Sequence, residues 1–222
     1  MVVKDCNFSV QKGEMIGLMG ESGSGKSTLA KLLIGLEKPS QGQVLLDGQP
    51  YSVKKSGVRI LLVFQDSLHS VNPHFTVEQV LTEALPKDVA REEIEAILED
   101  VGLDKSFLSQ PARQLSGGQL QRICIARGLL LKPDVLIFDE ALSGLDPIVQ
   151  GRLLRLLYDL WEKYQLTYLF ISHDFKLSYA LCHRILVMAD GEIVDEIKDF
   201  ELPIQAHHPV TKKLIGDKGH FS

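Results

Sequence analysis

The sequence predicts an α/β fold built around a mostly parallel sheet. Strand-sized apolar runs alternate along the chain with segments whose apolar residues recur every three or four positions, as on one face of a helix. The turn dipeptide Asp190-Gly191 separates the last two expected strands, which indicates a hairpin at the end of the sheet. Residues 66–115 carry only helical patterns, which favours a helical insert between two halves of a sheet protein.

Each expected element has its own local signal. A helix is expected after the glycine-rich turn that ends near residue 26, because Leu29, Leu33 and Leu36 fall on one stripe. Asp47-Gly48 marks a turn after the second strand. The expected strands are 14–20, 43–46, 60–64, 135–138, 167–171, 184–188 and 192–196, and the expected helices are 27–36, 77–85, 91–101, 119–131, about 150–164 and about 176–181.

The composition is that of an ordinary globular protein. The chain has 222 residues, of which 45% are hydrophobic and 24% charged, which excludes disordered and fibrous classes. Lys and Arg number 24 against 29 Asp and Glu, and this acidic balance argues against a nucleic-acid-binding domain. The apolar runs are too short for a membrane span, and the N-terminus lacks a signal-peptide pattern. The three cysteines lie far apart, so we expect reduced thiols in a cytosolic protein.

A phosphate-binding loop is predicted between the first strand and the first helix. Residues 20–27 read GESGSGKS, which matches GxxxxGK[ST] in the strand-to-helix context that this motif requires. Glycines let backbone amides approach phosphate oxygens, and the start of the helix adds a positive field. Lys26 is expected to reach the β- and γ-phosphates, and the Ser27 hydroxyl to ligate Mg²⁺. The expected nucleotide-binding residues here are Gly20, Glu21, Ser22, Gly23, Ser24, Gly25, Lys26, Ser27 and Thr28.

Two acidic residues follow the buried strand 135–138. Asp139 and Glu140 would emerge at the carboxyl end of this strand, which is where ligands bind in parallel sheets. Asp139 is expected to hold Mg²⁺, and Glu140 to polarise the attacking water as a general base.

A second anion-binding helix start lies far from the phosphate loop in the sequence. The segment Leu115-Ser116-Gly117-Gly118-Gln119 places a serine and two glycines before the helix 119–131. With this motif the sequence resembles the ATPase subunit of an ATP-binding cassette (ABC) transporter. In that family the LSGGQ helix of one subunit covers the nucleotide held by its partner. The resemblance therefore implies that Ser116, Gly117, Gly118 and Gln119 contact ATP across a dimer interface.

Further motifs match the family in order over about residues 3–200. Gln65 stands at the Q-loop position after the strand 60–64, which implies contact with Mg²⁺ or the attacking water. The segment Ser143-Gly144-Leu145-Asp146 resembles the D-loop, although the family more often has alanine at position 144, and it implies that Asp146 lies at the dimer interface. His173 matches the switch histidine that contacts the γ-phosphate. The implied catalytic residues are thus Glu140, His173, Gln65 and Lys26, and the implied metal ligands are Ser27, Gln65 and Asp139.

The resemblance also implies an architecture and a set of partners. The fold would be a P-loop NTPase (RecA-like) core with a mostly parallel sheet, a small antiparallel β part and an inserted α-helical subdomain. We expect one ABC ATPase domain over 1–222, with the core in 1–66 and 119–200, the helical subdomain in 67–118 and a tail in 201–222. The adjacent His207 and His208 of this tail are expected to be solvated. The implied cofactors are ATP and Mg²⁺.

The implied partners are a second ABC ATPase subunit, identical or different, two integral membrane permease subunits and, indirectly, an extracytoplasmic solute-binding protein, but no nucleic acid. Such a subunit would lie peripherally on the cytoplasmic face of the cell membrane.

Four stretches resemble the nickel, dipeptide and oligopeptide importer branch of the family. They are FQDSLHSVNPHFTV at 64–77, QLQR at 119–122, DEALS at 139–143 and HPVTK at 208–212. The implied function is ATP hydrolysis that powers uptake of nickel, a metal chelate or a di- or oligopeptide. The alternatives are a soluble ABC ATPase not coupled to a transporter and a non-hydrolysing regulatory subunit, which the presence of Glu140 and Ser116 disfavours. The family's adenine-stacking aromatic has no assigned residue, since neither Phe8 nor Tyr51 matches its position.

Overall fold

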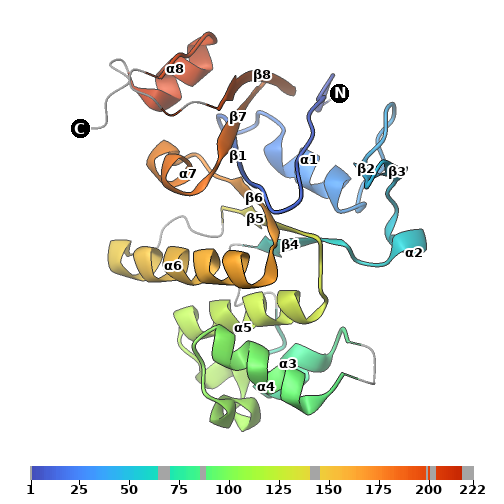
Figure 1. Cartoon of the computed structure of the whole chain (residues 1–222), viewed down its shortest axis with the longest axis vertical. Helices are drawn as coiled ribbons and strands as arrows, with labels where there is room; N and C mark the ends of the chain where they lie inside the picture. The colour runs from blue at the N-terminus through green and yellow to red at the C-terminus, as the bar shows by residue number, and fades with distance from the viewer. Residues whose placement is uncertain are drawn as a thin grey trace.

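The computed structural model describes residues 2–64, 71–85, 89–140, 146–198, 200 and 204–216. These residues form a six-stranded sheet with the order β4-β5-β6-β1-β7-β8. Every pairing is parallel except that of β7 with β8, which is the hairpin expected at Asp190-Gly191. The predicted mostly parallel α/β fold is therefore confirmed (Figure 1). The strands are β1 (Met15–Met19), β4 (Ile60–Phe64), β5 (Val135–Asp139), β6 (Thr167–Ile171), β7 (Arg184–Ala189) and β8 (Glu192–Ile197).

Successive side chains of each strand enter two different cores, because they point to opposite faces of the sheet. On β1, Ile16 and Leu18 pack in the cluster that includes Leu29 of α1 (Lys26–Leu33). Met15 and Met19 pack in the larger cluster on the other face, which holds the buried side of several helices. Figure 1 shows α1 on one side of the sheet and α6 and α7 on the other. The helices of the larger cluster include α5 (Gly117–Leu130), α6 (Pro147–Tyr164) and α7 (Phe175–Leu181).

A small antiparallel hairpin stands apart from the main sheet. It pairs β2 (Leu45–Leu46) with β3 (Gln49–Pro50) and is followed by the one-turn helix α2 (Val53–Ser56). Asp47 and Gly48 both have positive φ, 51° and 73°, as a tight hairpin turn requires. The expected strand 43–46 is shorter than predicted, because only two residue pairs form the ladder.

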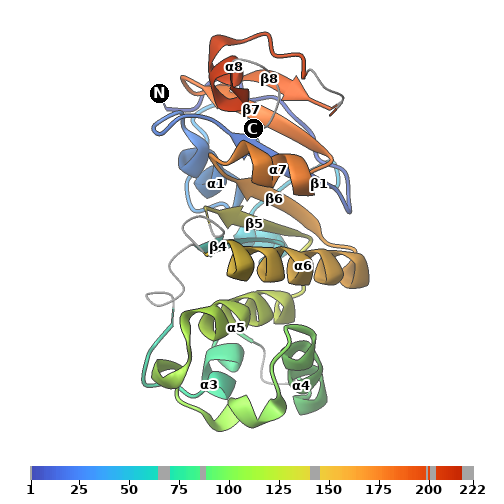
Figure 2. The same cartoon turned by 90° about the vertical axis from the view of Figure 1, so that its left-hand side faces the viewer.

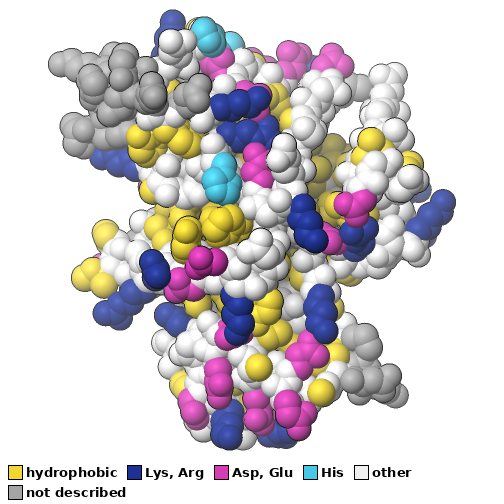
Figure 3. Space-filling view, viewed as in Figure 1, with side chains coloured by type: hydrophobic (Ala, Val, Ile, Leu, Met, Phe, Trp, Pro, Cys, Tyr) yellow, Lys and Arg dark blue, Asp and Glu magenta, His cyan; other side chains and the backbone are white. Residues whose placement is uncertain are grey.

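Short helices fill the segment between β4 and α5. They are α3 (Val77–Thr82), α4 (Arg91–Asp100) and the 3₁₀ turns Lys105–Ser109 and Ala112–Gln114. Val77, Val80 and Leu81 are fully buried, so these apolar residues stabilise the helical region itself. The exposed side of this region carries interleaved acidic and basic side chains (Figure 3). Within the described part of the chain, no helix is both long and apolar enough to cross a membrane.

The structure differs from the sequence analysis at two helices. Helix α6 begins at Pro147 rather than near residue 150, because Asp146 caps it and proline is favourable in the first turn. The tail after Phe200 contains a helix that was not expected, α8 (Pro209–Ile215). His208 is the N-cap of α8, and its Nδ1 accepts a hydrogen bond from the Val210 amide at 3.3 Å.

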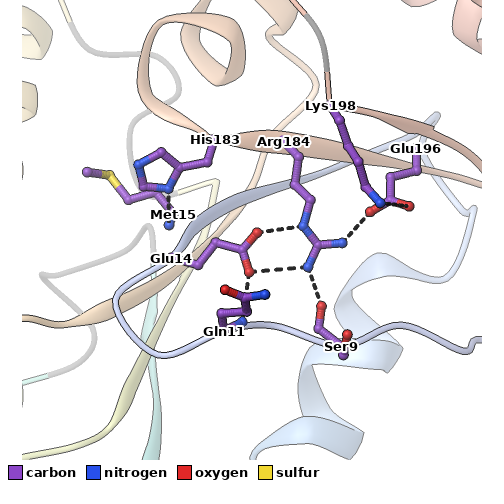
Figure 4. Close-up of polar contacts among 8 residues, drawn as sticks. All are labelled: Ser9, Gln11, Glu14, Met15, His183, Arg184, Glu196 and Lys198. Carbon is purple, nitrogen blue, oxygen red and sulfur yellow. Dashed lines mark hydrogen bonds and ion pairs between the residues drawn. The ribbon is translucent and has the colours of Figure 1, made fainter.

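One arginine joins three segments at the amino ends of the strands. The Nε of Arg184 donates to the Glu14 carboxylate at 2.6 Å, and its Nη atoms donate to Glu196 and to the Ser9 carbonyl (Figure 4). The Arg184 and Glu14 side chains are only 13% and 15% exposed. Arg184 therefore fixes the segment before β1, at the edge of the sheet opposite the phosphate loop.

Replacement of Arg184 by methionine is expected to lower the free energy of unfolding by about 2–3 kcal/mol at pH 7, because two carboxylates lose a partner. Burial raises the pKa of Glu14, but the hydrogen bonds from Arg184 and the Gln11 amide more than offset this, so the net pKa is lowered. A carboxyl with a lowered pKa contributes stability above its unfolded-state pKa, and this contribution is lost as the pH falls through its folded-state value.

The effect of Arg184→Met should therefore shrink below about pH 4, where a glutamate becomes protonated. Urea unfolding of both proteins at pH 7 and pH 3.5 measures this. The control is Lys198→Met, which removes only an exposed ion pair to Glu196 and should change stability by less than about 1 kcal/mol. An equal loss at both pH values would show that Arg184 acts through packing instead.

Candidate functional site

The loop between β1 and α1 has no room for side chains at two of its glycines. A Cβ on Gly20 would lie 2.2 Å from the Met188 carbonyl oxygen, and one on Gly25 would lie 3.0 Å from the Val2 carbonyl oxygen. Gly25 has φ 108° and is the N-cap of α1, which begins without a side-chain cap. The first amides of α1 therefore have no capping side chain to accept their hydrogen bonds. These amides, together with the positive end of the helix dipole, form a site that can bind an anion.

Lys26 is buried in this loop. Its ammonium donates to the carbonyl oxygens of Gly20 and Glu21, both at 2.8 Å, and approaches Ser24 Oγ at 3.4 Å. The side chain is held by neutral acceptors, and the residue is only 8% exposed. Burial lowers the pKa of Lys26, although the charges of Glu140 and Asp139, at the end of β5, oppose this shift. Anionic phosphate oxygens would be better partners for this ammonium than the carbonyls that it now contacts.

The acid at the end of β5 lies against the start of α1. Asp139 accepts a hydrogen bond from the Ser27 hydroxyl, which opposes the rise in its pKa caused by burial. Hydroxyl and carboxylate oxygens are suitable ligands for Mg²⁺. Among the described residues, no group of three or more His, Cys, Asp or Glu side chains could hold a metal ion.

Glu140 and His173 meet at the carboxyl ends of β5 and β6. The Glu140 Oε1 lies 3.4 Å from the His173 Nδ1, and both side chains are partly exposed, at 40% and 63%. The Glu140 backbone is left-handed, with φ 50°, and its amide donates to the Ile171 carbonyl of β6 at 2.9 Å. This turn directs the carboxylate toward the histidine, so two predicted catalytic residues lie side by side.

The fold of one chain does not bring Ser116 and Lys26 together. In both views α5 lies on the far side of β4 and β5 from α1 (Figures 1 and 2). Ser116 caps α5 in a reciprocal arrangement, since its Oγ accepts from the Gln119 amide at 3.3 Å and the Gln119 Oε1 accepts from the Ser116 amide at 2.9 Å. Gly117 and Gly118 are exposed, with open space where a Cβ would lie. The start of α5 is thus accessible to a partner.

The remaining predicted residues are placed as follows. Asp146 caps α6, with its Oδ1 accepting from the Ile148 amide at 2.9 Å. Ser22 and Gly23 are exposed in the loop, and Thr28 is half-buried in the first turn of α1. Gln65 and residues 143–145 lie outside the described residues. Sequence analysis missed Lys213 of α8, which forms an ion pair with Glu21, because 192 positions separate the two.

A buried lysine in a glycine-rich loop, at the start of a helix without a side-chain cap, is the arrangement by which P-loop domains bind the phosphates of a nucleotide, and the chain is of this class. The sequence profile of the family described as ABC transporter matches residues 3–143. The chain therefore belongs to the ABC transporter family.

Two curated relatives are import ATP-binding proteins. The chain is 41% identical to the nickel import ATP-binding protein NikE of Escherichia coli O6:K15:H31 over 233 aligned positions, which cover 100% of this chain and 81% of that protein. It is 38% identical to the metal-staphylopine import system ATP-binding protein CntF of Staphylococcus aureus, over 96% of this chain and 88% of that protein.

Solved structures of ABC ATPases share the fold. The cbiO1 protein of Clostridium perfringens, part of the ABC transporter complex cbiONQ, matches with a TM-score of 0.79 and 30% identity, over 88% of this chain and 81% of that chain. The ATP-binding cassette MJ0796, in a dimeric post-hydrolysis state bound to ADP and Pi, matches with a TM-score of 0.73 and 28% identity, over 89% of this chain and 90% of that chain.

Proposed function

We propose that this chain is the ATP-hydrolysing subunit of an ABC importer, and that it powers uptake of a small solute through partner membrane subunits. The observation that carries the catalytic part is the pairing of Glu140 with His173 beside the loop that holds Lys26. Burial lowers the pKa of Lys26, and the charges of Glu140 and Asp139 oppose this shift, so both acids interact electrostatically with the lysine. A phosphate-binding lysine, an acid and a histidine therefore share one edge of the sheet.

The relatives support a metal or metal chelate as the solute. One is described as a nickel import protein and another as part of a metal-staphylopine import system. Dipeptides and oligopeptides remain in the wider substrate class that the sequence indicates. A soluble ABC ATPase has no support from these relatives, and a non-hydrolysing subunit is disfavoured because Glu140 and Ser116 are both present.

In the proposed mechanism, ATP enters between the phosphate loop and the carboxyl ends of β5 and β6. Lys26 exchanges its bonds to the carbonyls of Gly20 and Glu21 for bonds to the β- and γ-phosphates, while the first amides of α1 bind phosphate oxygens. Mg²⁺ held by Ser27 and Asp139 would neutralise charge on the phosphates.

The chemical step would then involve the pair of side chains at the ends of β5 and β6. Glu140 accepts a proton from the attacking water, and His173 stabilises charge on the transferring phosphoryl group. Gln65 is assigned to the same step, at Mg²⁺ or the attacking water, from its position after β4.

The partners follow from the separation of the two anion-binding helix starts. We assign Ser116, Gly117, Gly118 and Gln119 to the nucleotide of a second ABC ATPase subunit, with Asp146 at the same interface. The dimeric ATP-binding cassette MJ0796 supports such pairing. Closure of the dimer would exclude water from the site and drive two membrane permease subunits through the helical region between β4 and α5. We place the complex on the cytoplasmic face of the membrane, supplied by an extracytoplasmic solute-binding protein.

Replacement of Glu140 by glutamine keeps the shape of the side chain and removes the proton acceptor. ATP turnover is expected to fall by about 10²–10⁴-fold, the usual scale for loss of a general base, while ATP affinity persists. Phosphate release and equilibrium ATP binding measure the two quantities separately. Hydrolysis near that of the parent protein would refute the assignment of Glu140.

Replacement of Ser116 by arginine tests the role of α5 across the interface. ATP binding to the monomer is expected to stay near that of the parent, while hydrolysis is lost. Mixing this variant with a Lys26→Ala chain should restore up to one working site per dimer, because the intact Lys26 loop of one chain meets the intact Ser116 of the other. Loss of monomer ATP binding in Ser116→Arg would contradict a role across the interface.

The importer assignment is tested with the membrane subunits encoded beside this chain. The complex is expected to copurify and, in vesicles supplied with the cognate binding protein, to take up Ni²⁺ or its chelate only with ATP. A complex containing Lys26→Ala should not transport, because the phosphate loop loses its cation. A chain that hydrolyses ATP but copurifies with no membrane protein would favour the soluble alternative.

A further inference from the structure

The phosphate loop carries an acidic side chain for which the proposed mechanism has no use. Glu21 lies directly after Gly20, and its carbonyl oxygen accepts a hydrogen bond from Lys26 at 2.8 Å. The backbone of Glu21 is therefore in direct contact with the lysine that would bind the phosphates, and the residue adds a negative charge to this loop. A triphosphate carries several negative charges, so an uncompensated carboxylate here would oppose its binding.

The structure pairs this carboxylate with a cation from the other end of the chain. Lys213 of α8 donates a hydrogen bond to Glu21 and forms an ion pair with it. The hydrogen bond and the charge of Lys213 lower the pKa of Glu21, which favours the ionised form of this carboxylate. Both side chains are partly exposed, at 76% and 46%, so salt will screen their interaction.

Helix α8 is anchored, so Lys213 is presented in a defined place. One oxygen of the Asp195 carboxylate, on β8, accepts from the His208 amide at 2.8 Å and from the Thr211 hydroxyl at 2.5 Å. Thr211 is fully buried, and Ile215 is 7% exposed. Both views show α8 at the end of the molecule away from α3 and α4, next to β7 and β8 (Figures 1 and 2).

The β7–β8 hairpin, on which α8 is anchored through Asp195, also contacts the phosphate loop directly. The Gly191 amide, in the turn between β7 and β8, donates to the Ser24 carbonyl at 3.0 Å. The Met188 carbonyl of β7 occupies the space where a Cβ of Gly20 would lie. The phosphate loop therefore has the β7–β8 hairpin packed against its backbone and α8 paired with its one acidic side chain.

We propose that Lys213 is a positioning residue for nucleotide binding. Its charge compensates the charge of Glu21, and the ion pair holds the phosphate loop against the β7–β8 hairpin. Helix α8 thereby contributes to ATP binding. This inference rests on the proposed function, because it requires the loop to bind ATP. Loss of one unit charge near a triphosphate in a solvated site is expected to weaken ATP binding roughly three- to tenfold at low salt.

The experiment compares two neighbouring lysines of α8 in the full chain. Lys213→Gln removes the partner of Glu21, whereas Lys212→Gln removes an equal charge from an adjacent exposed residue that makes no ion pair with the described part of the chain. Affinity for Mg²⁺-ATP is measured by titration calorimetry at about 50 mM and 500 mM salt, where screening differs strongly. We expect Lys213→Gln to weaken binding at low salt, Lys212→Gln to leave it unchanged, and Lys213→Arg to retain it.

A double-mutant cycle with Glu21→Gln identifies the cause. In the Glu21→Gln background, Lys213→Gln should no longer weaken ATP binding, because no carboxylate remains to be compensated. Adenosine, which lacks phosphates, serves as a second probe, and its affinity should be the same in all variants.

Several results would overturn the proposal. One is an equal effect of Lys212→Gln and Lys213→Gln. Others are an effect that persists in the Glu21→Gln background, or a matching loss of adenosine binding, which would indicate that α8 only stabilises the fold. Failure of the proposed function is distinguishable, since the parent chain would then bind no ATP or Lys26→Ala would bind it as well as the parent.

Discussion

The close approach of the phosphate loop to β7 is the constraint on which the rest of the site depends. Because Gly20 has no Cβ, the backbone can pass close to the Met188 carbonyl at the end of β1. The chain then turns and starts α1 at Lys26. That turn buries Lys26 against the loop's own carbonyls and sets Ser27 against Asp139 of β5. The strand order then brings the residues that follow β5 and β6 to the same edge.

The elements that could be predicted from the sequence are those whose signals are local. Strand β5 reads as a continuous apolar run because a parallel strand between two neighbours is buried on both faces, and its two acids mark the carboxyl edge of the sheet. The phosphate loop could be predicted because its glycines and lysine lie within eight consecutive residues between an expected strand and an expected helix. Glu140 and His173 were singled out one by one from the sequence, and the structure shows that their side chains lie side by side.

The features that could not be predicted depend on partners far away in the sequence. Helix α8 has only seven residues, too few to be stable through propensity alone, and it is fixed by Asp195 of β8. Nothing near Glu21 in the sequence indicates that its partner is Lys213. Likewise, the bonds of Arg184 to Ser9 and Glu14 span 175 and 170 positions. Such contacts follow from the packed fold rather than from any pattern in a short window of residues.

The left-handed backbone of Glu140 has a consequence for how this fold tolerates change. A glutamate in that conformation costs about 1 kcal/mol relative to glycine, which adopts it freely. The acid at this position therefore works against the stability of the turn that presents it. Sequence drift or selection for thermal stability alone would favour glycine or asparagine here. A glutamate here would therefore trade stability for the activity that we propose for it, and a copy of this fold with glycine at this position would be more stable but inactive.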